Sequence, residues 1–220
     1  MIDRLIVVAT NNGDDRVEQI AAATDAPILV IDTDTTRRKP APQRVLDLPH
    51  VVGWLQCPFA GYDTGAYLWA YFNVRAEHYM FMQDSCTPKD RNFTDYFHAA
   101  MRAPLGVVAW NTFDISIWDS PEQKGTVEYM YGPGPWPVRG IFGPIFYTSA
   151  LALDRLAERR LLPPYPMHKV MAQGMERAWS LAFYRAGVRL TTLTESYEPD
   201  RVGMARGDYP FLVKSFGGRA

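Results

Sequence analysis

Apolar runs alternate with amphipathic stretches through the first half of the chain. The segments 5–9, 28–31, 51–55 and 79–83 are mostly apolar and are strand candidates. The continuous apolar run at 5–9, bounded by turn-forming residues, is typical of a strand buried on both faces. Between them, 14–23 and the stretch that Asp63 or Thr64 could cap place apolar side chains at helical spacing. Strand and helix therefore alternate, and the pattern predicts βαβ units, right-handed connections and a mainly parallel sheet.

The second half of the chain is less regular. Gly187 follows the longest helical pattern, where a helix end favours a left-handed residue. We expect loops at 35–44 and around 131–137, where proline and glycine or charge accumulate. The other expected elements are helices at about 92–101, 149–160 and 168–186, and strands or extended segments at 106–110, 140–147 and 188–193.

Composition limits the possible partners. The 220 residues are 47% hydrophobic with a net charge of -1, so the chain can bury one core and has no bulk attraction for nucleic acid or anionic membranes. Cys57 and Cys86 are too few for a disulfide framework or a zinc site of the usual ligand count. No apolar run approaches the roughly 20 residues that span a bilayer, and the first residues lack the marks of an export signal. We therefore expect a cytoplasmic protein without a membrane span, of unspecified oligomeric state.

One acidic residue follows the apolar run at 79–83. Asp84 comes directly after this predicted strand, in the sequence Gln83-Asp84-Ser85. Open α/β sheets bind ligands at the carboxyl ends of their strands. Asp84 is therefore a candidate for a phosphate or metal site.

The order of these elements resembles the GT-A fold glycosyltransferases, in particular the inverting family 2 type. The resemblance covers residues 1–90 and about 140–193, and rests on LIVVATNNGDD, ILVIDTD, GYDTGAYLWAYFNVRAEHYMFMQDSCTP and MERAWSLAFYRAGVRL. It implies a Rossmann-like α/β fold in one domain over 1–220, with a mostly parallel central sheet flanked by helices. Residues 1–90 would bind the nucleotide-sugar, 91–200 would carry the acceptor and catalytic half, and 201–220 would form a C-terminal tail.

The resemblance places nucleotide contacts at the ends of the first two strands and in the turn before the next long helix. A carboxylate there can accept hydrogen bonds from ribose hydroxyls or a base N–H. Asp and Asn also favour turns and caps for purely local reasons, which is the alternative interpretation. The nucleotide-binding residues that the resemblance implies are Thr10, Asn11, Asn12, Asp32, Asp34, Asp63 and Gly65.

The same resemblance implies a metal site at the end of the fourth strand. Gln83 and Ser85 stand where the family's Asp-x-Asp motif has its two aspartates, and Asp84 between them is the only carboxylate. A hard divalent cation, Mn²⁺ or Mg²⁺, accepts one carboxylate with further oxygen ligands. Asp84 assisted by Ser85 would hold it, unless Asp84 only caps the following turn.

A catalytic base is implied on the last long helix. Glu176 occupies the place of the family's base, and Met175 that of its acidic neighbour. A carboxylate there can take the proton from an acceptor hydroxyl, and Arg177 and Arg185 could keep it ionised. The alternative is a solvated helix Glu paired with a neighbouring Arg.

Aromatic residues between the matched segments are candidates for the acceptor side. Tyr131 and Trp136 lie in a loop stiffened by prolines, and such rings can stack on a sugar face or a peptide. The alternative is that these rings fold into the core.

The resemblance implies a glycosyltransferase that moves a sugar from a nucleotide-diphosphate sugar, such as a UDP-sugar, to a hydroxyl of a protein or glycan, in a bacterial or phage setting. A GT-A-like domain that only binds a sugar or partner is the first alternative, favoured by the missing aspartates. A sugar-phosphate nucleotidyltransferase is the second, and the lack of a glycine-rich basic loop after the first strand disfavours it.

Overall fold

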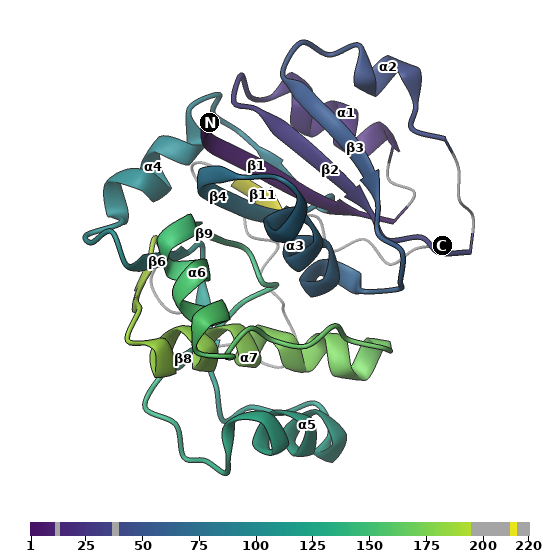
Figure 1. Ribbon diagram of the computed structural model, residues 1–220. Helices are drawn as coiled ribbons and strands as arrows, with labels where there is room; N and C mark the ends of the chain where they lie inside the picture. Colours follow the sequence, from purple (N-terminus) through teal and green to yellow (C-terminus); the bar gives the residue numbers. More distant parts are fainter. Residues whose placement is uncertain (12–13, 37–39, 195–211, 215–220) are drawn as a thin grey trace.

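The computed structural model describes residues 1–11, 14–36, 40–194 and 212–214. Its centre is a seven-stranded sheet with helices on both faces (Figure 1). β9 runs antiparallel to both of its neighbours, and every other adjacent pair is parallel. Across the sheet the strands are β10 (Arg189–Thr192), β6 (Gly106–Ala109), β9 (Phe146–Ser149), β4 (Ala76–Gln83), β1 (Ile2–Thr10), β2 (Ile28–Asp32) and β3 (Val51–Gln56). The predicted α/β fold with a mostly parallel sheet is confirmed.

The strands at the centre of the sheet are buried on both faces. β1 pairs with β4 from Ile2 opposite Ala76, and with β2 from Ile6 opposite Ile28. Residues 5–9 of β1 are at most 3% exposed. Because successive side chains of a strand point to opposite faces, a continuous apolar run supplies both faces of the sheet at once.

Each face of the sheet has its own core. Trp179 and Phe146 belong to one core, whereas Trp110 and Tyr147 belong to the other. The first core lies under α3 (Tyr62–Asn73), α6 (Ala150–Glu158) and α7 (Lys169–Ala186), and the second under α1 (Asp14–Ala22), α2 (Gln43–Leu46) and α4 (Phe93–Ala100). α5 (Pro121–Tyr131) packs on α7, outside the first layer (Figure 1).

Two short antiparallel ribbons accompany the main sheet. One joins β5 (Cys86–Pro88) to β11 (Leu212–Lys214), and the other joins β7 (Thr112–Asp114) to β8 (Arg139–Ile141). The second ribbon packs against α7, where the Ser180 hydroxyl accepts a hydrogen bond from the Ile141 N–H at 2.9 Å.

The entry into α3 differs from the prediction in its cap. The helix begins at Tyr62 after Gly61, and neither Asp63 nor Thr64 caps it. A Cβ on Gly61 would lie 2.6 Å from the Cα of Gly65, so only glycine fits this close backbone approach. Tyr62 itself has a φ of 48°, in the left-handed region.

Two predictions for the less regular segments differ from the structure in part. The described residues of 35–44 lie outside helices and strands up to Pro42, and the last two belong to α2, which begins at Gln43. The segment 140–147, expected to be one extended stretch, is divided into β8 and β9. Gly143 between them has a φ of 62°, which glycine adopts without strain and which turns the chain.

α5 is a helix that the hydrophobic pattern did not predict. Among its residues only Gln123, Val127 and Tyr131 are buried, so it has almost no apolar stripe. Its start nevertheless carries a local signal: the Ser120 hydroxyl accepts from the Gln123 N–H at 3.3 Å, and Pro121 occupies the first turn.

The helices predicted at 149–160 and 168–186 are confirmed as α6 and α7. Ser149 caps α6 by accepting from the Ala152 N–H at 3.1 Å, and His168 caps α7 through Nδ1. Gly187 ends α7 with a φ of 72°. None of the helices that the structure describes is long and apolar enough to cross a membrane.

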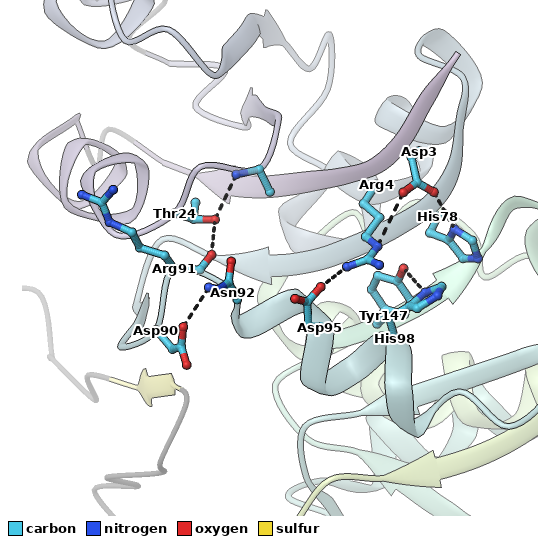
Figure 2. A network of polar contacts seen from close by, with 11 residues as sticks. Asp3, Arg4, Thr24, His78, Asp90, Arg91, Asn92, Asp95, His98 and Tyr147 are labelled. Atoms are coloured by element: carbon cyan, nitrogen blue, oxygen red, sulfur yellow. Dashed lines mark hydrogen bonds and ion pairs between the residues drawn. The ribbon is translucent and has the colours of Figure 1, made fainter.

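A polar network lies at the amino edge of the sheet, where β1 and β4 begin (Figure 2). Arg4 forms an ion pair with Asp95 of α4. The Nδ1 atom of His98, also on α4, lies 3.0 Å from the hydroxyl of Tyr147 on β9, and the His78 ring of β4 stacks on that tyrosine at 5.6 Å between centroids. This network joins α4 to three strands.

Candidate site at the carboxyl edge of the sheet

The carboxyl ends of β1, β2 and β4 bring three predicted site residues to one edge. Thr10 pairs with Asp32 of β2, and Ala9 pairs with Gln83 of β4, so Asp84 follows beside Thr10. The Thr10 hydroxyl donates to Asp84 Oδ2 at 2.9 Å, and the Asp84 N–H donates to the Ala9 carbonyl at 3.0 Å. Adjacent parallel strands thus place these polar groups where such sheets bind ligands.

The carboxylates at the end of β2 are held by local hydrogen bonds. Asp32 is 2% exposed, and it accepts from the Asp34 N–H at 2.9 Å and from Gln56 Nε2 at 3.0 Å. Asp34 accepts from both the N–H and the hydroxyl of Thr36. These are bonds of the turn type that Asp favours. They orient the carboxylates, whose several acceptor positions are compatible with further contacts.

The end of β4 is tied to the first turn of α3. Gln83 Nε2 donates to Asp63 Oδ2, and the Ser85 hydroxyl donates to Gln83 Oε1 at 3.2 Å. Asp84 Oδ1 lies 3.8 Å from Arg16 Nη1 of α1, and the Asp84 side chain is 14% exposed. The end of β4 therefore combines the carboxylates of Asp63 and Asp84 with a hydroxyl, an amide and one guanidinium.

This set of donors fits a hard divalent cation. Mn²⁺ and Mg²⁺ take carboxylate, hydroxyl and amide oxygens, and usually keep waters or phosphate oxygens as the remaining ligands. Asp84 and Ser85 were predicted as ligands, and Gln83 links the carboxylate of Asp63 to the same strand end. Arg16 places a positive charge at the same carboxylate.

Another group of possible metal ligands lies at the opposite edge. In the part of the chain that the structure describes, Asp3, Glu77 and His78 hold ligand atoms within 4.8 Å of one another. They come from the first residues of β1 and β4, next to the network in Figure 2. This cluster is therefore separate from the carboxyl-edge site.

Two residues of the site were missed from the sequence. Arg16 is the third residue of α1, the helix that follows β1, and Gln56 is the last residue of β3 and pairs with Asp32. A polar residue that ends an apolar strand, and a cation in the first turn of the next helix, are weak signals that could have indicated them. Asn11 follows β1 and is half-buried, whereas Asn12 lies outside the described residues.

Gly65 lies one turn into α3, beneath aromatic side chains. A Cβ at this position would lie 3.3 Å from the Phe59 ring and 3.6 Å from the Tyr165 ring. The position is buried. The structure therefore assigns Gly65 a packing role in the first turns of α3.

Glu176 lies on α7 beside a buried cation. The next residue, Arg177, is 4% exposed, and its guanidinium lies 4.7 Å from the ring centroid of Phe113 and 4.5 Å from that of Trp118. Burial lowers the pKa of Arg177, whereas the charges of Glu176 and Asp119 raise it. The charge of Glu176 therefore acts on the guanidinium of Arg177.

Arg185, the second cation predicted to act on Glu176, contacts another part of the chain. It donates to the backbone carbonyl of Tyr131, and it lies more than two helical turns beyond Glu176.

A hydrogen bond joins α7 to α3: Trp179 Nε1 donates to the Thr64 hydroxyl at 3.0 Å. Since Glu176 precedes Trp179 by one turn on the same helix face, this turn of α7 lies next to the start of α3.

The two predicted acceptor residues have different environments. Tyr131 is 3% exposed, and this burial raises the pKa of its hydroxyl. The hydroxyl donates a hydrogen bond to the Leu161 carbonyl at 3.0 Å. It is a core residue and presents no ring face to an acceptor, which corrects the prediction. Trp136 lines two adjoining cavities of about 550 and 430 Å³ and contacts Trp118 edge-on at 5.9 Å between centroids.

Comparison with known proteins finds similarity in structure and none in sequence. No protein-family model matches the chain, and no curated protein matches its sequence. GalNAc-T7 with UDP, GalNAc and Mn²⁺ matches with a TM-score of 0.60 at 10% identity, over 87% of this chain and 42% of that one. TarS 1–349 from S. aureus matches with a TM-score of 0.54 at 12% identity, over 89% of this chain and 59% of that one.

The same TarS fragment in complex with UDP matches with a TM-score of 0.50, 12% identity and the same two coverages. The chain therefore spans less than two thirds of the length of each of these structures. At this level of identity the similarity shows the fold alone. The chain has the GT-A type fold of nucleotide-sugar glycosyltransferases.

Proposed function

We propose that this protein is a glycosyltransferase that moves a sugar from a nucleotide-diphosphate sugar, in the first instance a UDP-sugar, to a hydroxyl of a protein or glycan. The observation that carries the proposal is the gathering of Thr10, Asp32 and Asp84 at the carboxyl edge of a GT-A type sheet. Structures of this fold have been solved with UDP.

The strand ends would bind the donor. Asp32, oriented by Gln56, offers a fixed carboxylate to the hydroxyls of a ribose or to a base N–H. Asp84 and Ser85, with Asp63 nearby in the hydrogen-bonded chain, would hold a divalent cation, which when bound offsets the charge of the leaving diphosphate. Arg16 contributes a positive charge of its own at this end of the site.

Glu176 would act as the general base of an inverting, in-line displacement. A base must be ionised and aimed at the acceptor hydroxyl. The neighbouring Arg177 cation favours the ionised form of this carboxylate. The contact between Trp179 and Thr64 fixes this turn of α7 next to α3, the helix that carries Asp63.

The proposed chemistry is tested with a panel of nucleotide-sugar donors, with and without Mn²⁺, by measuring donor hydrolysis and transfer. We expect Glu176→Gln to bind donor as tightly as the unchanged protein, measured by calorimetry, and to lose transfer by about a hundredfold or more. Glu158→Gln, an exposed glutamate on α6, is the matched control and should keep full activity. Equal activity of both variants would remove Glu176 as the base.

The metal role rests on a second pair of variants. Asp84→Asn keeps an acceptor for the Thr10 hydroxyl but removes the charge, so it should lose the response to Mn²⁺ together with activity. Arg16→Gln should weaken donor binding and retain the response to Mn²⁺. A response to Mn²⁺ that is unchanged in Asp84→Asn would refute the assignment.

A domain that only binds a sugar or partner is the second candidate. It is favoured by Gln83 and Ser85, which stand where carboxylates were expected and bond to each other. Under this alternative a donor stabilises the protein, yet neither hydrolysis nor transfer occurs with any donor or metal. Failure of every donor to bind would exclude both the glycosyltransferase and a domain that binds nucleotide-sugars, and would leave a domain that binds only a partner.

A further inference from the structure

The open edge of β10 borders a cavity of about 550 Å³. The five consecutive residues 188–192 line this cavity. Further lining residues are Trp136, which precedes β8, Arg139, the first residue of β8, and Ser180 and Tyr184 of α7. Thr10, Asp32, Asp84 and Glu176 are not among its lining residues. The cavity is thus distinct from the carboxyl-edge site.

Among the described residues, no strand pairs with the outer side of β10, whose residues line this cavity. β10 is the last strand of the sheet in the described part of the chain, and it pairs with β6 on one side. On that side the Arg189 N–H donates to the Leu105 carbonyl at 3.2 Å, and the Leu193 N–H donates to the Ala109 carbonyl at 3.0 Å. Because backbone groups alternate along a strand, the N–H and C=O groups of the intervening residues 190 and 192 point away from β6.

The cavity is also positively charged. Among the described residues, its lining includes Arg139 and Arg189 and neither aspartate nor glutamate. Arg139 Nε donates to the Thr112 hydroxyl at 3.2 Å, whereas its Nη2 and the Nε1 of Trp136 are buried without a hydrogen-bond partner in the described part of the chain. Asp114 lines the adjoining cavity and accepts hydrogen bonds from Ser116. These hydrogen bonds, and to a smaller extent the charge of Arg139, lower the pKa of Asp114. The lining therefore favours an anionic group.

We propose that the edge of β10 and this cavity bind an extended, acidic peptide segment of a partner protein. The segment adds a strand beside β10, with backbone hydrogen bonds to residues 190 and 192, and places a carboxylate beside Arg139 and Arg189. A second copy of this chain fits less well, because pairing two β10 strands would bring like charges of Arg189 together. The proposal does not depend on the transferase activity.

The test uses the full chain and synthetic octapeptides in which glutamate alternates with valine or threonine, with binding followed by fluorescence anisotropy. Two matched sets serve as controls: one replaces each glutamate by glutamine, and the other places proline at the central position, where it removes a backbone donor. We expect the glutamate peptides to bind at least about tenfold more tightly than either control set. Equal binding of the glutamate and glutamine sets, or no binding by any peptide, overturns the proposal.

Variants of the chain locate the site. Thr192→Pro removes an N–H that faces away from β6, and Arg189→Gln removes an exposed charge; each should weaken peptide binding about tenfold. Thr192→Val keeps the N–H and is the matched control, expected to bind as the unchanged chain does. If Thr192→Pro melts at a lower temperature than this control, Arg189→Gln alone decides. Unaltered binding by Arg189→Gln, or concentration-dependent dimerisation that competes with the peptide, contradicts the proposal.

Discussion

At the scale of single residues, the hydrogen bond between Thr10 and Asp84 joins the ends of two strands. It is made between a buried hydroxyl and a carboxylate that is 14% exposed. Hydrogen bonds to charged groups contribute about 1.5–3 kcal/mol. The bond therefore both stabilises the sheet edge and fixes the carboxylate on which the proposed metal site depends.

We expect Thr10→Val to lower the free energy of unfolding by about 1–3 kcal/mol, since it keeps the shape and removes the donor to Asp84. Thr10→Ser keeps the hydroxyl and should lose less. Urea unfolding of the three proteins measures the difference, and equal midpoints for Val and unchanged protein would mean that the bond contributes nothing.

Arg177 is a buried cation without a carboxylate within ion-pair distance in the described residues. Phe113 and Trp118 flank its guanidinium, and the Ile117 carbonyl accepts a hydrogen bond from it. The burial of its charge costs free energy that the aromatic rings and carbonyl groups offset.

Arg177→Ala should therefore destabilise the protein by about 2–4 kcal/mol, because it removes the packing and leaves a cavity. Arg177→Met fills the same space without a charge to desolvate, and should cost much less or nothing. Chemical denaturation of both variants distinguishes the effects. If alanine and methionine cost the same, the charge rather than the packing of Arg177 holds this region.

At the scale of elements, the strands of the first half were predictable because their burial on both faces appears in the sequence as continuous apolar runs. β1, β2 and β4 follow this rule. The helix α5 was not predictable from apolar spacing, because only three of its residues are buried. Its start is set instead by the local cap that Ser120 provides. The segment 140–147 is divided into β8 and β9 because the backbone turns at Gly143. The spacing of apolar residues does not indicate such a turn.

The site was predictable only in part. Thr10, Asp32 and Asp84 follow from their place at strand ends, because parallel strands bring their carboxyl ends to one edge. The contacts of Arg16 and of Gln56 arise from tertiary packing between elements distant in the chain. Tyr131 was assigned to a loop, but it is the last residue of a helix that packs its ring into the core.

The attachment of α4 to the sheet should depend on pH through His98. Burial lowers the pKa of His98, the charges of Arg4 and His78 lower it further, and Asp3 and Asp95 partly oppose them. The folded chain therefore binds this proton less readily than the unfolded chain, whose histidine titrates near about 6.5. The stability is fully present above that value and falls as the pH decreases through it towards the lower folded value.

We expect the free energy of unfolding to decrease between about pH 7 and pH 5.5, and His98→Gln to flatten this decrease. Urea unfolding at a series of pH values measures both curves. Tyr147→Phe removes the hydroxyl that contacts His98 and should alter the same part of the curve. An unchanged slope in His98→Gln would assign the pH dependence to other groups.

At the scale of the whole molecule, a ligand that binds only the folded chain raises its melting temperature. UDP at about a hundred times its dissociation constant would stabilise the fold by about 2.7 kcal/mol, or about 5–10 °C for a chain of this size. We expect this shift with UDP and Mn²⁺, and a smaller one in Asp32→Asn. Differential scanning fluorimetry measures it, and the absence of any shift at millimolar UDP would contradict donor binding at this edge.

The position of β9 in the sheet sets an order of events during translation. β6 pairs only with β9 and β10 among the described strands, and both follow it in the chain. β1 to β4 can assemble as soon as Gln83 has left the ribosome, whereas β6 waits until Phe146–Ser149 has emerged. At roughly 5–20 residues per second this delay lasts a few seconds. During that time the nascent chain carries an unpaired apolar strand, and chaperone binding should be strongest within this window of synthesis.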